Sequence, residues 1–246
     1  MDEVEGYSII NGLGTGRFSR VYEVKNSANN QMRFVLKYYS GPFKEMGRHE
    51  ESILKLLETE NINNVPKFQD LVERAHYSAL VVTPVGIPII LASQTYRITP
   101  EMVLNLLSVL RIAHSLQIIH RDVKPENIFL NNSNPQQIIL NDWGSAVRLD
   151  NLVNGECIYQ GTPLYGEECI HGVNQKPTKS LDLCCFVKTI FTIKQQKYPR
   201  CDLDRDGIQN YWKGVARDFP NFQTLLDVAS AEDYFSLENY FRDMCF

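Results

Sequence analysis

The chain has 246 residues, of which 43% are hydrophobic, and its formal net charge is −4 at pH 7. This length suits one large domain or two small lobes around a shared site, and the apolar content is sufficient for a buried core. The slight acidity and the lack of a basic cluster argue against nucleic acid or an acidic membrane surface as the main partner.

The six cysteines form no C-x-x-C pair, and Cys184 and Cys185 are adjacent. This spacing fits neither a zinc ribbon nor a compact disulfide framework, so we expect reduced thiols in an intracellular protein of the cytoplasm or nucleus. The N-terminal stretch MDEVEGYSII lacks the apolar core of a signal peptide. The most apolar run, residues 79–91, is too short to span a bilayer. We therefore expect a soluble protein with no membrane partner.

Residues 1–85 contain mainly strand patterns. The stretch YSIINGLGTGRFSRVYEVKN predicts two strands joined by a glycine-containing turn, and MRFVLKYY, PKFQDLVE and SALVVT predict three more. Residues 43–57 have helical spacing, with Ile53, Leu54 and Leu57 on one face. We expect a small, mostly antiparallel sheet that carries one helix.

From Thr99 onward the pattern is predominantly helical. Thr99 is a capping hydroxyl, followed by Pro100 at the first helical position, and apolar residues then recur at helical spacing. Further helices are predicted over 181–193 and 222–229. The fold prediction is α+β: a β-rich lobe over 1–85 and an α-rich lobe over 86–246, together one domain.

A polar stretch lies between two apolar flanks in IIHRDVKPENIFL, residues 118–130. Charge in such a place needs compensation, so we expect a loop held at both ends whose polar groups face something charged. Asp122, Lys124 and Asn127 supply a carboxylate base, a cation and an amide. Asp142 follows an apolar strand, and together with Asn127 it offers the hard oxygen ligands that Mg²⁺ prefers.

Three features of the first lobe are also suited to a site that binds a phosphate. Gly14 and Gly16 lie between two strands, where backbone N–H groups can approach a phosphate closely. Lys37 ends an apolar strand and can neutralise that phosphate, and Glu50 on the following helix can hold the lysine. Taken singly, Lys37 also fits a solvated lysine at the end of a strand, Glu50 a solvated helix face, and Asp142 an ordinary turn.

Because these features follow one another in this order along the sequence, the chain resembles the eukaryotic-type protein kinases. The family's catalytic-loop pattern matches residues 120–127 with only Val123 in place of leucine, and SLDLCC supplies a later helix aspartate, Asp182. The resemblance covers nearly the whole chain. It implies a two-lobed kinase fold, ATP and Mg²⁺ as cofactors, and a protein as substrate.

The resemblance also implies roles for the catalytic-loop residues. Asp122 would orient the substrate hydroxyl and accept its proton, while Lys124 would contact the transferred phosphoryl group. Asn127 and Asp142 would hold Mg²⁺, and Asp182 would brace the backbone of the loop.

In the first lobe, the resemblance implies that Lys37 binds the α- and β-phosphates and that Glu50 locks the lysine in place. The adenine pocket would have two valines as its roof, a phenylalanine as its floor, a third valine as gatekeeper and two backbone contacts after it. The implied nucleotide-binding residues are Gly14, Gly16, Val21, Val35, Lys37, Val82, Thr83, Val85 and Phe129.

Some positions depart from the commonest family pattern. Ser19 replaces the third loop glycine, Val35 replaces an alanine, and DWG replaces DFG. The same changes occur in casein kinase 2, an active enzyme, so they do not predict a dead site. The A-P-E triplet is degraded to residues 166–168, where we take Glu168 as the structural glutamate and Arg217 as its partner.

The segment over residues 145–160 contains no threonine and a single serine, Ser145, which is too close to the metal aspartate to act as the usual switch. Arg121 marks the class of kinases that often needs a phosphate in this segment. We expect Asp150 or Glu156 to pair with Arg121 in place of phosphate, and the activity to be constitutive.

The leading interpretation is an active serine/threonine kinase, since Lys124 and Thr162 in GTPLY resemble that branch. A small-molecule kinase of the aminoglycoside or choline type is a first alternative, but that type favours glycine where Arg121 stands and lacks the Lys124-Pro125 pair. A pseudokinase acting as a binding scaffold is a second alternative. Such proteins usually lose the equivalent of Lys37, Asp122 or Asp142, whereas all three residues are present in this chain.

We expect a monomer. The strings ILNDWGSA and LVVTPVG, and the C-terminal stretch FQTLLDVASAEDYFSLENYF, also resemble kinase domains of crinkler-type effectors of fungi and oomycetes. This second resemblance would imply action inside a host cell, often in the nucleus.

Overall fold

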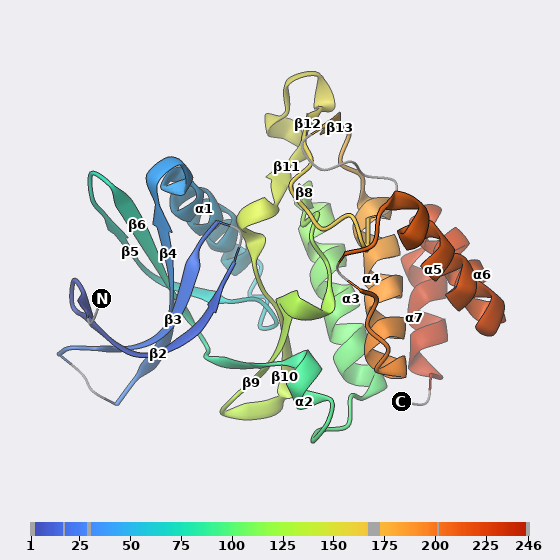
Figure 1. The fold of residues 1–246 in the computed structure, drawn as a ribbon, viewed down its shortest axis with the longest axis horizontal. Coiled ribbons are helices and arrows are strands. Elements are labelled where there is room, and N and C mark those ends of the chain that lie inside the picture. Colours follow the sequence, from blue (N-terminus) through green and yellow to red (C-terminus); the bar gives the residue numbers. More distant parts are fainter. Residues whose placement is uncertain (1–2, 17, 29–30, 167–172, 201, 245–246) are drawn as a thin grey trace.

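The structure is a computed structural model that describes residues 3–16, 18–28, 31–166, 173–200 and 202–244. A strand-rich lobe and a helix-rich lobe lie side by side (Figure 1). This arrangement confirms the predicted α+β architecture. In the part of the chain that is described, no helix combines the length and apolar character needed to cross a membrane.

The first lobe is built on a six-stranded antiparallel sheet with the strand order β1-β2-β3-β4-β6-β5. Its strands are β1 (Glu3–Val4), β2 (Tyr7–Thr15), β3 (Arg20–Asn26), β4 (Arg33–Ser40), β5 (Lys67–Glu73) and β6 (Tyr77–Thr83). The strands expected from the sequence are all present. The helix α1 (Glu45–Thr59) begins two residues later than predicted, because Gly41–Phe43 first form a short 3₁₀ turn.

Strand alternation divides the side chains of β4 between two faces of the sheet. Phe34 and Leu36 belong to a small apolar cluster with residues of β1, β2, β3 and β6. Val35 and Tyr39 belong instead to the main core, where α1 buries Ile53, Leu54 and Leu57 as predicted. Lys37 is on the same face as Val35 and Tyr39, so it lies toward the second lobe.

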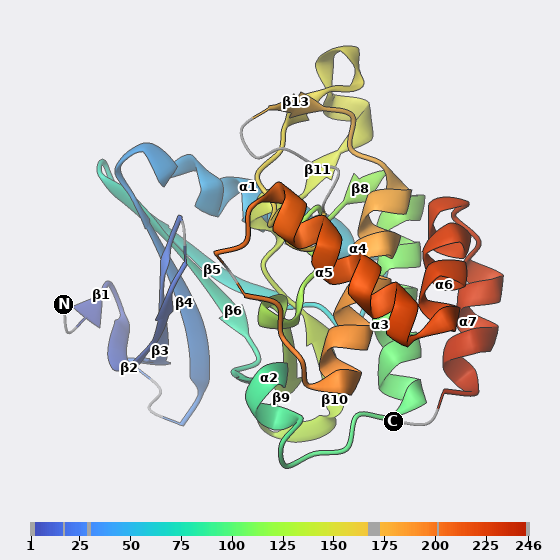
Figure 2. The same cartoon turned by 45° about the vertical axis from the view of Figure 1, so that its right-hand side comes forward.

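The second lobe consists of helices and three small sheets, with α5 crossing over α4 in Figure 2. The helices are α2 (Ile89–Ala92), α3 (Pro100–Ser115), α4 (Lys179–Gln195), α5 (Arg205–Asp218), α6 (Pro220–Ser230) and α7 (Tyr234–Arg242). The strands are β7 (Gly86–Pro88), β8 (Ile118–Ile119), β9 (Ile128–Asn131), β10 (Asn134–Leu140), β11 (Val147–Arg148), β12 (Cys157–Ile158) and β13 (Asn174–Gln175).

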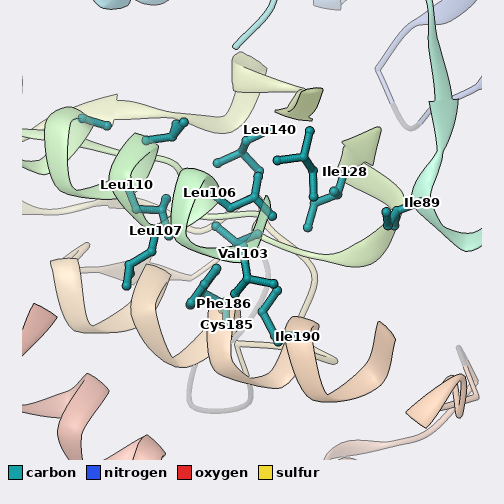
Figure 3. Close-up of a cluster of buried hydrophobic side chains, with 14 of the residues drawn as sticks. Ile89, Val103, Leu106, Leu107, Leu110, Ile128, Leu140, Cys185, Phe186 and Ile190 are labelled. Atoms are coloured by element: carbon teal, nitrogen blue, oxygen red, sulfur yellow. The ribbon is translucent and has the colours of Figure 1, made fainter. Parts of the chain in front are cut away.

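Helix α3 is the centre of this lobe. The Thr99 hydroxyl accepts a hydrogen bond from the Met102 N–H, and Pro100 is the first helical residue, which confirms the predicted start. The helix buries apolar side chains against α4 on one side and against β9 and β10 on the other (Figure 3). The loop between β8 and β9 is therefore anchored at both ends to a rigid core.

The connection between the lobes runs through residues 83–86. Strand β6 ends at Thr83 in the first sheet, and β7 begins at Gly86 and pairs with β9 in the second lobe. The predicted division at residues 85 and 86 falls in this connection and stays a prediction.

Candidate active site

The backbone of the loop after β8 is held by Asp182, at the start of α4. One carboxylate oxygen accepts the His120 N–H at 2.6 Å, and the other accepts the Arg121 N–H at 2.7 Å. Asp182 is fully buried, and the N-terminal end of a helix favours its negative charge. Asp182 thus makes the bracing contacts that the family resemblance implied for it.

Asp122, Lys124 and Asn127 come together inside this loop. The Asp122 carboxylate accepts hydrogen bonds from the Asn127 side chain at 3.0 Å and from the Thr162 N–H at 2.8 Å. The Lys124 ammonium lies 2.8 Å from the same carboxylate and 2.7 Å from the Thr162 hydroxyl. Thr162 therefore ties the segment after β12 to the carboxylate and to the cation of the loop.

Lys37, Glu50 and Asp142 form a second charged cluster. The Lys37 ammonium lies 2.6 Å from Glu50 and 3.1 Å from Asp142, although it is almost fully buried. Burial alone would lower the pKa of Lys37, but the two carboxylates outweigh burial and raise it. In turn, the charge of Lys37 and the hydrogen bond that it donates lower the pKa of the Asp142 carboxyl. Lys37 and Asp142 are therefore both charged at neutral pH.

Asp142 has a left-handed backbone, with φ 62° and ψ 64°, which is uncommon for a residue other than glycine. The next residue holds this conformation in place. Trp143 is fully buried, its indole N–H donates to the Leu140 carbonyl at 2.9 Å, and its ring meets the His120 ring edge-on. The His120 ring is fixed in turn by a 3.0 Å hydrogen bond to the Asn141 carbonyl.

Asn127 and Asp142 fit a magnesium ion by their donor atoms. The Asn127 amide nitrogen donates to the backbone carbonyl and the carboxylate of Asp122, and no described residue donates a hydrogen bond to its oxygen. The Asp142 side chain is half exposed. The Asn141 N–H donates to the Asn127 carbonyl at 2.8 Å, so the two segments are adjacent. Two oxygen donors of this kind suit Mg²⁺, which completes its shell with phosphate and water.

Four of the residues expected around adenine lie in the sheet of the first lobe. Val35 on β4 pairs with Val82 on β6, and Val21 on β3 pairs with Gly14 on β2. Gly16 closes the turn after β2, where its N–H donates to the Ser19 carbonyl.

On the second-lobe side of this region, the backbones of β7 and β9 lie close together. A Cβ at Gly86 would lie only 2.8 Å from the Phe129 Cβ, so glycine lets β7 pass close to β9. Thr83 and Val85 stand just before it, and the Val85 carbonyl accepts the Asn132 N–H at 3.1 Å. The Val85 N–H is then the group that could meet a base.

The predicted pairing of Arg121 with Asp150 or Glu156 is wrong. The buried Arg121 guanidinium donates to the backbone carbonyls of Ser145 and Ile158, at 2.6 and 2.9 Å, and lies 3.0 Å from the Cys157 sulfur. Asp150 pairs instead with Arg148, two residues away in a short turn. Burial lowers the pKa of Arg121.

The pairing expected between Glu168 and Arg217 cannot be followed to its glutamate, because Glu168 lies outside the described residues. Arg217 itself is at the end of α5, with its side chain 81% exposed and 3.3 Å from Asp218. At that exposure, Arg217 is not part of a buried ion pair.

Sequence reasoning missed two side chains that support the site. The Tyr39 hydroxyl donates to Glu50, and His114 bonds both to Asp182 and to the Tyr234 hydroxyl. Tyr39 could have been found, because it stands two residues after Lys37 and so on the same face of the strand. His114 is one of the regularly spaced residues of α3, and nothing in the spacing distinguishes it from a core position.

Comparison with known proteins agrees with this geometry. The model of the family "Protein kinase domain" matches residues 7–213. A probable casein kinase II subunit alpha homolog of Encephalitozoon cuniculi is 30% identical over 148 residues, covering 58% of this chain and 44% of that protein. A serine/threonine-protein kinase dkf-2 of Caenorhabditis briggsae is 27% identical over 261 aligned positions, covering 93% of this chain and 21% of that protein.

Among solved structures, vaccinia related kinase 3 superposes with a TM-score of 0.71 at 18% identity, covering 96% of this chain and 86% of that one. This likeness shows the fold. The chain spans less than half the length of the curated relatives it matches first. Because the family model covers most of its residues, the chain belongs to the protein kinase domain family.

Proposed function

We propose that this protein is an active serine/threonine kinase that transfers the γ-phosphate of ATP to hydroxyl groups of proteins. The observation that carries the proposal is the Lys37 ammonium, held at once by Glu50 and Asp142. A binding scaffold without catalytic activity would not need the buried Lys37 between Glu50 of the helix and Asp142, an aspartate suited to bind a metal ion. This intact centre favours the enzyme over the pseudokinase.

The residues of the loop after β8 would act on the acceptor. Asp122 would orient the substrate hydroxyl and take its proton as the new oxygen–phosphorus bond forms and the bond to the β-phosphate oxygen breaks. Lys124, between Asp122 and Thr162, would stabilise the charge of the transferred group. The Lys124 contact with Thr162 supports the serine/threonine branch.

The remaining residues would place the nucleotide. Asn127 and Asp142 would hold Mg²⁺, and Lys37 would contact the α- and β-phosphates. When bound, Mg²⁺ neutralises the charge that develops on the phosphate oxygens. Gly14, Gly16, Val21, Val35, Val82, Thr83, Val85 and Phe129 would surround ATP. Positioning and charge stabilisation account for most of this chemistry, which is why rigid support of each group matters.

Constitutive activity is part of the proposal. The buried Arg121 already contacts Ser145 and Ile158 through its guanidinium, so the segment is tied to the loop without phosphate. A monomer inside the cell, with a protein as its substrate, remains our expectation, as does action in a host cell if the crinkler-type resemblance holds.

The test is transfer of labelled γ-phosphate from Mg·ATP to the protein itself and to a mixed protein substrate, followed by identification of the labelled amino acid. We expect phosphoserine or phosphothreonine. Label on a small acceptor alone would indicate the small-molecule kinase, and nucleotide binding without transfer would indicate the scaffold.

A further inference from the structure

Tyr39 is a buried tyrosine that none of the signature positions includes. It lies on β4 two residues after Lys37, and only 2% of it is exposed. Its hydroxyl donates to Oε2 of Glu50 at 2.5 Å, a charge-assisted hydrogen bond inside the protein. Burial, together with the nearby Glu50 and Asp142 carboxylates, raises the pKa of Tyr39 well above its ordinary value. The hydroxyl therefore keeps its proton and remains a donor.

The two oxygens of Glu50 have separate donors. Oε1 accepts from the Lys37 ammonium at 2.6 Å and from the Trp143 N–H at 3.2 Å. Among the described residues, Tyr39 is the hydrogen-bond donor to Oε2. Glu50 has no exposed surface, so water cannot replace a donor that is lost. Each oxygen thus depends on the residue that faces it.

These bonds connect α1 to two other parts of the molecule. Lys37 and Tyr39 belong to the sheet, whereas Trp143 belongs to the segment after Asp142. On the same helix, the His49 ring donates to the Ala146 carbonyl at 2.7 Å. Gly144 lies beside the Tyr39–Glu50 contact, where an added Cβ would come within 3.5 Å of Oε2. For α1 to turn away, Glu50 would have to give up donors from both parts.

We propose that Tyr39 is a positioning residue of the catalytic centre. It fixes the carboxylate of Glu50 in the orientation that presents Oε1 to Lys37, and so it holds α1 in the catalytic position without a phosphate or a partner protein.

This inference rests on the proposed kinase function and supplies a physical cause for constitutive activity. Tyr39→Phe removes the hydroxyl and keeps the ring. Tyr38→Phe is the matched control, because Tyr38 is the next residue on the strand, points to the opposite face and stacks on Tyr77 at 4.9 Å. We expect Tyr39→Phe to lower kcat roughly tenfold, the effect of a lost hydrogen bond to a charged group, and Tyr38→Phe to leave it unchanged.

A double-mutant cycle distinguishes positioning from a general loss of folded protein. Tyr39→Phe is combined with Glu50→Gln, and kcat is measured for each variant after active enzyme is counted by nucleotide binding. If Tyr39 acts through Glu50, the double variant is no slower than Glu50→Gln alone. Independent, multiplicative losses would overturn the proposal. Lys37→Arg provides a second background in which the same coupling is expected, should Glu50→Gln not fold.

The wild-type protein separates this inference from the function on which it rests. Wild-type protein that transfers no phosphate would contradict the proposed kinase activity itself. Active wild type with a fully active Tyr39→Phe variant overturns the role of Tyr39 and leaves the kinase assignment in place.

Discussion

Lys37 and Arg121 are both almost fully buried cations, 3% and 4% exposed, but their charges meet different partners. Lys37 contacts two carboxylates, and the pKa of Lys37 is raised. Arg121 donates to two backbone carbonyls and contacts a cysteine sulfur, and burial lowers the pKa of Arg121. In the first centre, the buried charge is paired with opposite charges. The second uses its hydrogen bonds to hold a loop.

The largest expected effect comes from removing a carboxylate of the Lys37 centre. Asp142→Asn should reduce phosphoryl transfer to background and abolish the strengthening of nucleotide binding by Mg²⁺, since an amide is a poor replacement for a charged metal ligand. The fold should persist, because the Asp142 side chain is half exposed. Transfer assays, a Mg²⁺ titration of nucleotide affinity and the Tm would check this. Retained Mg²⁺-dependent turnover contradicts the assigned role.

Asp122→Asn tests the loop that Arg121 and Asp182 hold in place. We expect kcat to fall by about 10²–10⁴-fold, the usual contribution of a positioned base, with little change in KM for ATP. An asparagine oxygen can still accept the Thr162 N–H, and the Asp182 brace on the loop backbone is untouched, so the loop should keep its shape. Steady-state kinetics against a protein substrate provide the measurement. A variant with near wild-type kcat would remove Asp122 from the chemistry.

The pH dependence of stability should reveal the charge balance around Lys37. Because the pKa of Asp142 lies below 3.8, its contribution to folding is present above that pH and is lost as the pH falls through the lowered value. The raised pKa of Lys37 means that its contribution is present below pH 10.5 and is lost only at higher pH. Urea unfolding of wild type and Asp142→Asn should therefore differ at neutral pH and converge in strong acid. A constant difference would contradict the ion pair.

The smallest effect is expected from substituting Asp150 and Glu156, the two carboxylates that the sequence suggested as partners of Arg121. Asp150→Asn and Glu156→Gln should each change kcat by less than about twofold, because neither carboxylate contacts Arg121 and surface substitutions are usually mild. The measurement is kcat of each variant beside wild type. A loss of fivefold or more from either would restore the pairing that the sequence predicted.

The difference between these two centres also explains what could be predicted from the sequence. Lys37 lies inside β4, three residues further from its end than the sequence suggested, Glu50 lies on a regular helix, and Asp142 follows β10 closely. Periodicity fixes the direction of side chains in such elements, so residues far apart in the chain can be brought together by inference. The Asp182 brace was predicted from the resemblance to the kinase family and not from periodicity.

Loop paths could not be predicted in this way. Between β11 and β12 the chain forms two 3₁₀ turns, and Asn154 has a positive φ, so the carboxylate of Asp150 turns to Arg148 instead of Arg121. The pairing of β7 with β9 was missed because only three residues of β7 take part and Gly86 gives no apolar signal. These features depend on tertiary contacts, which leave no local pattern in the sequence.

The most direct test of the account is phosphoryl transfer by wild-type protein that has first been treated with a phosphatase and then freed of it, beside Asp142→Asn. The account predicts that the treated wild type transfers the γ-phosphate of Mg·ATP to serine or threonine as fast as the untreated protein, and that the variant does not. Activity that disappears on dephosphorylation and returns only with another kinase would contradict it.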